Sequence, residues 1–254
     1  MANKPSHLEP SPLGTKEYWE TLYTTELHNH TLDTTDEGTI WFADSAAEDK
    51  ILPFLAEQIL DKQILGPETG AENCSFLDLG TGNGHLLFRL RGVGEDEEDE
   101  EEVKWTGRML GVDYSAKSVE FARKLAEQKG LDEKDIAFQH WDILSSPPED
   151  ILQAEQTEGW DVVLDKGTFD AISLSDEVDA QGRRVCEGYK GRVMELVRRG
   201  GLFLVTSCNW TPAELRGWFE GEGFGVVGEI AYRRFRFGGE EGQTIASVCF
   251  RREE

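Results

Sequence analysis

Three glycines at every second position, Gly80, Gly82 and Gly84, follow a short apolar segment typical of a β-strand and precede a helical pattern. Glycine lets the chain turn sharply and lets a ligand lie on bare backbone. Asp78, just before the glycines, suits a cation such as an ammonium group. A dinucleotide-binding turn would need G-x-G-x-x-G, but His85 stands where the third glycine belongs. We interpret the segment as a ligand-binding turn; the alternative is a tight turn without a ligand.

Three further aspartates end predicted strands: Asp113, Asp142 and Asp165, the last followed by Lys166. Asp113 could accept both hydroxyls of a ribose, and Asp142 could meet an adenine amino group. Open α/β sheets bind ligands outside the carboxyl ends of their strands. Together with Asp78, the aspartates predict a pocket for a cationic, sugar-bearing ligand, and sulfonium, ammonium and ribose together describe S-adenosylmethionine. For Asp113 and Asp142 the alternative is an ordinary strand end, and for Asp165 it is a cap for the turn that follows.

The elements that must position these residues alternate between strand and helix, which predicts a mostly parallel sheet with helices on both faces. The last two strands have no helix between them and should pair as an antiparallel hairpin at the far edge of the sheet. The predicted strands are 74–80, 108–113, 136–142, 160–167, 201–207, 224–230 and 244–250. The predicted helices are 46–65, 85–91, 115–130, 183–200 and one that begins at Thr211.

The first 45 residues form a separate predicted region. Residues 1–14 contain three prolines and are expected to be a loose tail, and apolar residues at helical spacing then predict a helix over 14–27 with Thr15 as its cap. The remaining residues, 46–254, are expected to form one domain. Within that domain, Glu95–Glu102 are eight consecutive acids, so we expect a disordered, solvated loop at 93–104.

The composition limits the function. The chain has 254 residues, 26 basic and 50 acidic side chains and a net charge of −24, which argues against binding to a nucleic-acid backbone or to a membrane surface and favours a basic partner. No two of the four cysteines have the spacing of a zinc or redox motif, and the histidines do not suggest a metal site. No apolar run is long enough to cross a bilayer. We expect an intracellular protein with reduced thiols, located in the cytoplasm.

The glycine turn, Asp113 and the terminal hairpin resemble the S-adenosylmethionine-dependent methyltransferases with a Rossmann-like seven-stranded fold, over roughly residues 46–250. More specific segments are LGTKEYWETLYTTEL and EGTIWF near the start, LDKGTFDAISLS in the middle and SCNWTPAEL after the fifth strand. Together they resemble the lysine methyltransferases that modify translation elongation factor 1-alpha. The acidic insert and the long loop from Asp176 to Tyr189 depart from that pattern, but neither touches the motifs.

The resemblance implies roles for individual residues. Asp78 faces the amino group of the cofactor and Asp113 its ribose. The other implied cofactor contacts are the glycines at the methionine end, two aromatic residues beside the adenine, an aspartate at its edge and a tryptophan that covers the site from the N-terminal region: Gly80, Gly82, Gly84, Tyr114, Trp141, Asp142 and Trp41. The residues implied to line the lysine channel are Asp165, Lys166 and Phe169.

The reaction implied is an in-line displacement at the methyl carbon of the sulfonium. It needs a neutral lysine amine, although free lysine has a pKa near ~10.4, and we expect Asp165 to orient the ammonium before it loses its proton. The partner expected is a basic protein, elongation factor 1-alpha, and the enzyme is expected to be a monomer. Three alternatives remain: a small-molecule or arginine methyltransferase, an NAD-dependent oxidoreductase, which His85 disfavours, and a non-catalytic scaffold.

Overall fold

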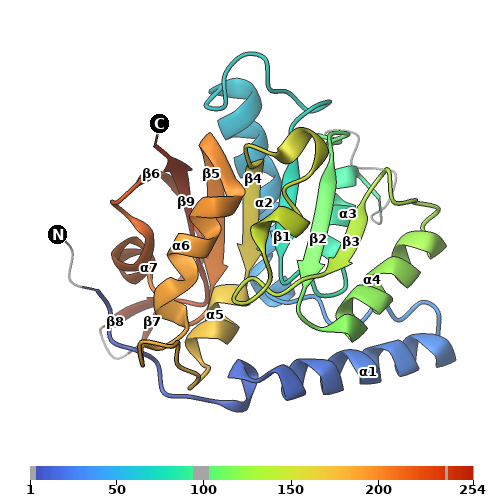
Figure 1. The fold of residues 1–254 in the computed structure, drawn as a ribbon, viewed down its shortest axis with the longest axis horizontal. Helices are drawn as coiled ribbons and strands as arrows, with labels where there is room; N and C mark the ends of the chain where they lie inside the picture. The colour runs from blue at the N-terminus through green and yellow to red at the C-terminus, as the bar shows by residue number, and fades with distance from the viewer. Residues whose placement is uncertain (1–3, 94–102, 238–239, 254) are drawn as a thin grey trace.

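The protein is built on a seven-stranded sheet in the order β3-β2-β1-β4-β5-β9-β6 (Figure 1). The computed structural model describes residues 4–93, 103–237 and 240–253. β1 pairs in parallel with β2 and β4, and β9 runs antiparallel between β5 and β6. The strands of this sheet are β1 (Phe76–Leu79), β2 (Met109–Asp113), β3 (Ala137–His140), β4 (Trp160–Lys166), β5 (Val197–Ser207), β6 (Phe224–Ile230) and β9 (Ala246–Arg252).

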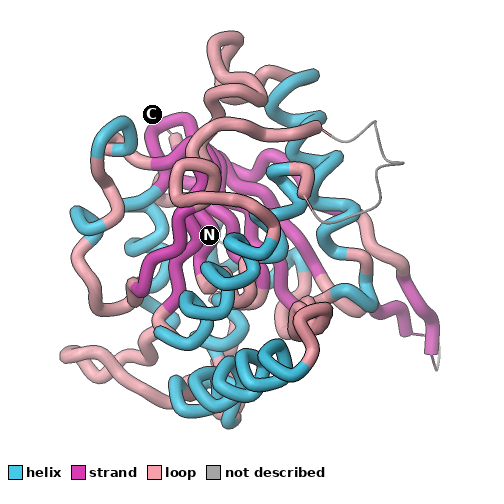
Figure 2. Tube along the Cα trace, turned by 90° about the vertical axis from the view of Figure 1, so that its right-hand side faces the viewer, coloured by secondary structure: helices cyan, strands magenta, loops and turns pink. Residues whose placement is uncertain are grey.

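This arrangement confirms the predicted fold class and the terminal antiparallel hairpin. Two strands were missed, however, because the glycine- and arginine-rich segment between β6 and β9 was taken for a loop. It contains β7 (Arg234–Phe237) and β8 (Glu240–Gln243), which pair as a separate two-stranded sheet. Figure 2 shows this hairpin standing away from the main sheet.

Helices cover both faces of the sheet, with α2 behind it and α6 in front in Figure 1. The helices are α1 (Lys16–Leu32), α2 (Ala47–Ala56), α3 (His85–Arg91), α4 (Ala116–Gln128), α5 (Thr168–Ser173), α6 (Cys186–Leu196) and α7 (Pro212–Phe219). The predicted helix over 183–200 is too long, because the chain enters β5 at Val197. Gly200 and Gly201, expected to end the helix, instead lie at an irregularity where β5 has extra residues opposite β4.

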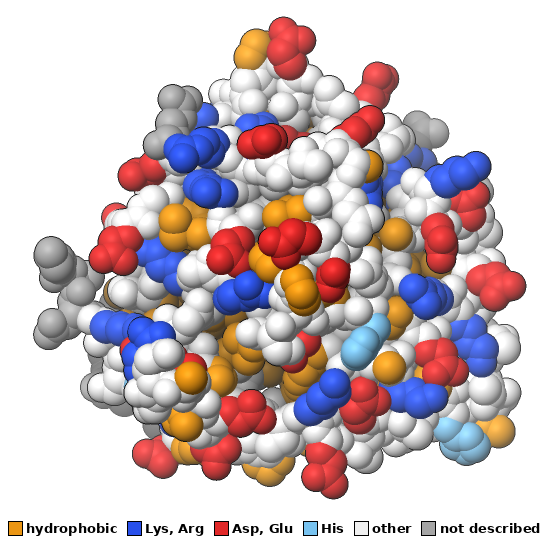
Figure 3. All heavy atoms as spheres, viewed as in Figure 1, with side chains coloured by type: hydrophobic (Ala, Val, Ile, Leu, Met, Phe, Trp, Pro, Cys, Tyr) orange, Lys and Arg blue, Asp and Glu red, His pale blue; other side chains and the backbone are white. Residues whose placement is uncertain are grey.

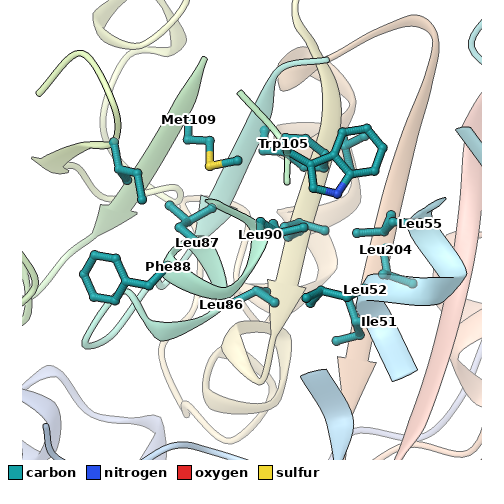
Figure 4. Packing of buried hydrophobic residues seen from close by; sticks show 14 of the residues in the cluster. Ile51, Leu52, Leu55, Leu86, Leu87, Phe88, Leu90, Trp105, Met109 and Leu204 are labelled. Atoms are coloured by element: carbon teal, nitrogen blue, oxygen red, sulfur yellow. The ribbon is translucent and has the colours of Figure 1, made fainter. Parts of the chain in front are cut away.

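Alternate residues of the central strands point to two separate cores, as the period of two in a strand requires. Phe76 belongs to the core shared with α2, α3 and α4, whereas Leu77 belongs to the core shared with α5, α6 and α7. Figure 4 shows the first of these cores, where Leu86 of α3 points toward Leu52 of α2, and Leu52 lies near Leu204 of β5. Because both faces are buried, the central strands are continuous apolar runs, which explains why the sequence predicted them well.

The N-terminal region differs from the loose tail that was expected. Lys4 forms an ion pair with Glu187 of α6, His7 stacks on Trp218 of α7, and the Ser11 N–H donates to Leu174. The predicted cap of α1 is confirmed, since the Thr15 hydroxyl accepts from the third residue of that helix.

Three further predictions concern the helix over 46–65, the acidic run and membrane-spanning segments. The predicted helix over 46–65 is confirmed as far as Asp61, because α2 ends at Ala56 and continues directly into a π-helical segment over Glu57–Asp61, and only its last residues are not helical. The acidic run Glu95–Glu102 lies outside the described residues. No helix within the described ranges is long and apolar enough to span a membrane.

Candidate functional site

The glycine turn after β1 has a backbone that only glycine adopts without strain. Gly80 and Gly82 have φ of 64° and 60°, in the left-handed region. A Cβ on Gly80 would lie 2.0 Å from the Thr168 hydroxyl oxygen, and one on Gly82 would lie 2.6 Å from the Tyr23 hydroxyl oxygen. The turn therefore packs its bare backbone closely against α1 and the start of α5, and contact of this backbone with a ligand stays a prediction.

Asp78 is a buried carboxyl group at the centre of the sheet, 3% exposed. Burial raises its pKa to about 7, although the Thr81 hydroxyl and the charge of Lys166 act in the opposite direction. Within the described part of the chain, no backbone N–H donates to the Asp78 carboxyl group, whose favourable neighbours are the Thr81 hydroxyl and the Lys166 ammonium. A bound ammonium group would compensate the cost of ionising Asp78, so this residue fits its predicted role.

Asp113 lies next to the glycine turn, as predicted, but the protein already uses both of its oxygens. Oδ2 accepts from the Gly82 N–H at 3.1 Å and from the Ser118 hydroxyl at 2.8 Å, and Oδ1 accepts from the Ser115 N–H at 2.8 Å. Burial raises the pKa of Asp113, and these donors lower it. Since an ionised carboxylate has about four acceptor positions, Asp113 can brace the glycine turn against α4 and still accept from a ligand.

The residues predicted around the adenine lie at the ends of β2 and β3 with different exposure. Tyr114 is half-buried, and Lys16 lies 5.5 Å from its ring centroid. Trp141 is buried in the core beside α6, and its indole N–H donates to the Pro147 carbonyl at 3.0 Å. Asp142 is half-buried and accepts hydrogen bonds from its own turn. The role of Trp141 and Asp142 beside an adenine stays a prediction.

Asp165, near the end of β4, is held by the start of α5. Its oxygens accept from the Thr168 N–H at 2.8 Å, from the Phe169 N–H at 3.0 Å and from the Tyr189 hydroxyl at 2.6 Å. It is 1% exposed, and burial raises its pKa to about 7 despite these donors. Asp165 therefore caps the turn, which was the alternative considered for it, and a direct contact with substrate stays a prediction.

Phe169 is a core residue of this half of the molecule. It is 1% exposed, and its ring lies 5.3 Å from that of Tyr189, 6.1 Å from Trp210 and 4.8 Å from Phe219, measured between centroids. Sequence reasoning placed Phe169 on the wall of a lysine channel. With these neighbours, an influence of Phe169 on a substrate passes through the aromatic rings around it, so its place on the wall stays a prediction.

Lys166 links the end of β4 to the N-terminal region. Its ammonium donates to the Trp41 carbonyl at 3.1 Å and lies 3.5 Å from Oε1 of Glu48 in α2. Trp41 packs on Trp19 of α1 with ring centroids 5.2 Å apart, and its own indole N–H is buried with no hydrogen-bond partner among the described residues. The structure thus places Trp41 beside the end of β4, and its role as a cover over a cofactor stays a prediction. Glu48 was missed, because nothing distinguishes it in sequence from other acids in a first helical turn.

The N-terminal region reaches the glycine turn through residues that sequence reasoning had assigned no role. Tyr23 of α1 lies against Gly82, and the charges of Asp113 and Asp78 help burial to raise its pKa. The Asn83 side chain donates to the Glu37 carbonyl at 2.9 Å. In the sequence, Tyr23 is only one of the apolar residues at helical spacing. Its hydroxyl reaches the glycine turn because α1 crosses that turn, below the sheet in Figure 1.

The structure thus brings the predicted residues together in two groups. The glycines, Asp78 and Asp113 form one group, with covering contacts from α1. Asp165 and Lys166 form the other at the end of the adjacent strand β4. The bare backbone and the two buried carboxyl groups, Asp78 and Asp113, fit a ligand with an ammonium group and a ribose. Among the residues that the structure describes, no three His, Cys, Asp or Glu side chains are grouped as a metal site.

Comparison with known proteins adds independent information. Residues 71–240 match the family model described as "Methyltransferase domain". The chain is 40% identical over 243 residues to the protein-lysine N-methyltransferase EFM4 of Saccharomyces cerevisiae, with 96% of each chain covered. It is 33% identical to the EEF1A lysine methyltransferase 2 of Danio rerio, covering 99% of this chain and 92% of that protein. The human protein of the same name is 30% identical, with 96% and 88% covered.

Solved structures agree on the fold. The [4+2]-cyclase SpnF superposes with a TM-score of 0.60 at 13% identity, covering 100% of this chain and 99% of that one. Magnesium protoporphyrin IX methyltransferase from Synechocystis PCC 6803, solved with bound SAM, gives 0.52 at 13% identity, covering 91% and 97%. At such identities the likeness shows the fold alone, and a cyclase beside a methyltransferase shows that this fold does not determine the reaction.

Proposed function

The chain belongs to the methyltransferase-domain family and, within it, to the protein-lysine N-methyltransferases, and we propose that it methylates a lysine of translation elongation factor 1-alpha with S-adenosylmethionine as methyl donor. The observation that carries the proposal is the 40% identity to EFM4 across 96% of both chains. The relatives from Danio rerio and human carry EEF1A, the elongation factor, in their names. Similarity of this extent includes the N-terminal region as well as the sheet.

The first group of residues is proposed to hold the cofactor. Asp78 receives its ammonium group, the backbone of Gly80 and Gly82 lies against its methionine end, and Asp113 accepts from its ribose. Trp41 covers the site, and the remaining cofactor contacts in the proposal are Gly84, Tyr114, Trp141 and Asp142. The cofactor supplies a methyl group bound to a positively charged sulfur. The residues around the cofactor bind it, orient it and exclude water. Holding the reacting atoms in the correct geometry accelerates the reaction.

The second group is proposed to shape the lysine side of the site. Lysine has to lose its proton before it can attack, and a buried environment lowers the pKa of an amine. Asp165 is proposed to set the position of the backbone after β4, where the amine would approach, through the hydrogen bonds that fix Thr168 and Phe169. Lys166 and Phe169 complete this side. The role of all three is then to position the reacting nitrogen in line with the methyl carbon and the sulfur.

The proposed partner is a basic protein surface. A net charge of −24 attracts such a surface over long range. Figure 3 shows acidic and basic side chains mixed over one face, so on that face the excess negative charge is not gathered into a single patch. A cytoplasmic location, a monomeric enzyme and the absence of nucleic acid among its partners belong to the same proposal.

The test is a methylation assay with the full-length protein, S-adenosylmethionine and purified elongation factor 1-alpha, followed by mass mapping of the modified peptides. The expected result is a gain of methyl mass on a lysine of the factor. Asp78→Asn serves as the impaired control. Methyl transfer to an arginine, or to small molecules and not to the factor, would contradict the proposed substrate. Cofactor binding without transfer to any component of a cell lysate would favour a scaffold.

A further inference from the structure

Glu48 is a buried carboxylate that the proposed reaction does not use. It is 5% exposed and lies in the first turn of α2. Its Oε2 lies 2.6 Å from His85 Nδ1, and its Oε1 faces the Lys166 ammonium at 3.5 Å. Burial raises the pKa of Glu48, but the hydrogen bond with His85 and the charges of Lys166 and His85 outweigh it, so the pKa lies below its usual range. An ionised carboxylate at this depth needs these partners.

The partners of Glu48 belong to the walls of the cofactor site. His85 begins α3 directly after the glycine turn, and Lys166 ends β4 directly after Asp165. Lys166 in turn holds the Trp41 carbonyl. Glu48 therefore joins, through its two oxygens, the helix that follows the glycine turn and the strand next to Asp78.

The segment held in this way, residues 37–46, is here called the cover segment. Its backbone is strained, because Phe42 and Ala46 have φ of 66° and 51°, where residues other than glycine are uncommon. Such strain persists only where the surroundings impose it. Side-chain contacts with the rest of the protein include Asn83 to Glu37, the Thr39 hydroxyl to Glu26 at 2.8 Å, Lys129 to Glu37, Trp19 against Trp41, Lys166 to Trp41, and Ser45 to Thr244 at 2.8 Å. Of these, the Lys166 bond lies next to the strained Phe42.

We propose that Glu48 is a positioning residue that keeps Lys166 aimed at Trp41 and thereby holds the cover segment over the cofactor site. Without the carboxylate, the Lys166 ammonium loses its buried counter-ion and turns toward water. The cover segment then loses the bond next to Phe42, and the cofactor loses the wall that Trp41 provides. The effect on the cofactor rests on the proposed function, whereas the effect on the cover segment does not depend on it.

The test compares Glu48→Gln and Lys166→Met with Glu57→Gln, all in the full-length protein. Glu57 is the matched control, since it forms an ion pair with Lys62 at 3.0 Å just after α2, with both side chains 53% exposed. Hydrogen exchange without cofactor is measured for the cover segment and, as a reference, for β4 and β5. Calorimetry then gives the Kd for S-adenosylmethionine, and steady-state kinetics separate KM from kcat.

The proposal expects exchange in the cover segment to rise at least ~10-fold in Glu48→Gln and Lys166→Met, with the reference strands unchanged, and the Kd to rise about 10-fold, as for the loss of one charged hydrogen bond. In Glu48→Gln, KM for the cofactor should rise, while kcat at saturation changes less than about 3-fold. Glu57→Gln should match the wild type. The double variant should fall short of the product of the single effects, because both remove one link.

The proposal is overturned if both single variants keep wild-type exchange in the cover segment, or if exchange rises equally in β4 and β5, which would mean general destabilisation. If Glu48→Gln does not fold, Lys166→Met decides alone, because it removes the other end of the same link. A wild-type protein that binds no S-adenosylmethionine would refute the proposed function, and the exchange data would still decide the role of Glu48.

Discussion

The turns after β1 and β4 are built alike but leave their aspartates in different states. Asp78 and Asp165 are each the penultimate residue of a strand, both are buried, and burial raises the pKa of each to about 7. Each strand is followed by a left-handed glycine that precedes a helix, Gly84 before α3 and Gly167 before α5. The difference lies in the donors: backbone N–H groups and Tyr189 satisfy Asp165, whereas no described backbone N–H donates to Asp78.

We propose that this difference separates a carboxylate that serves the fold, Asp165, from one that binds a ligand, Asp78. Position, burial and pKa do not distinguish the two residues, and only the count of protein donors does. A buried acceptor with few protein donors costs stability, and we propose that Asp78 is retained after β1 because a ligand supplies further donors. The opposite holds after β4, where removal of the carboxylate leaves donors without an acceptor.

The largest effect is expected from Asp165→Ala. It leaves the Tyr189 hydroxyl and the N–H groups of α5 without an acceptor, so the free energy of unfolding should fall by about 2–3 kcal/mol. Methyl transfer should fall about 10²–10³-fold, because the backbone after β4 shifts. Denaturant unfolding and single-turnover rates measure both. As a control, Asp142→Ala removes a half-buried carboxylate with bonds only to its own turn and should cost less than about 1 kcal/mol. An Asp165→Ala enzyme with wild-type stability and the wild-type rate would contradict the proposed difference between Asp165 and Asp78.

Gly82→Ala sharpens the description of the glycine turn. The added Cβ meets the Tyr23 hydroxyl oxygen at 2.6 Å, so α1 or the turn must shift, and we expect the Kd for S-adenosylmethionine to rise about 10–100-fold. Gly130 is the matched control, because its φ of 73° is similar but nothing lies within 4 Å of its Cβ. Gly130→Ala should show only the conformational cost of about 1 kcal/mol and bind the cofactor normally. Equal Kd values for the two variants would mean that the ligand does not lie at the turn.

The pH dependence of cofactor binding tests the state of Asp78. In the proposed site, the ammonium group of the cofactor binds ionised Asp78. A pKa near 7 leaves the Asp78 carboxyl group protonated in most molecules of the free protein at pH 5.5. The Kd should therefore fall by about 10-fold as the pH rises from 5.5 to 7, while the ionised fraction increases. Calorimetry at several pH values measures this. Asp78→Asn should bind more weakly and lose the dependence, whereas a flat wild-type profile would show that Asp78 does not titrate on binding.

The strands and most helices could be predicted because buried parallel strands are continuous apolar runs and helices show their own period. The helix predicted over 183–200 was too long for a physical reason. Irregular pairing with β4 lets β5 begin before its glycines, and no residue in the local sequence indicates that early start. The contacts of residues 4–14 with α6 and α7 were likewise invisible, because they depend on Glu187 and Trp218, far along the chain.

The candidate site was predictable in its residues but not in their partners. Strand ends and glycines revealed Asp78, Asp113 and the turn, because these follow from local order in the chain. The partners of Asp165, above all Tyr189, come from an element that only the fold brings close. Burial of Phe169 and Trp141 in the core also depends on packing, which motif reasoning does not include.

The most direct test of the contrast between the two turns is one paired measurement on the isosteric variants Asp78→Asn and Asp165→Asn at pH 7.5. Calorimetry gives the Kd for S-adenosylmethionine, and denaturant unfolding gives the stability of the same samples. The account predicts that Asp78→Asn binds about 10–100-fold more weakly with unchanged or higher stability. Asp165→Asn should keep its Kd within about 2-fold and lose stability, since its new amide can accept from fewer of the donors. The reverse pattern, or equal losses in both variants, would contradict the account.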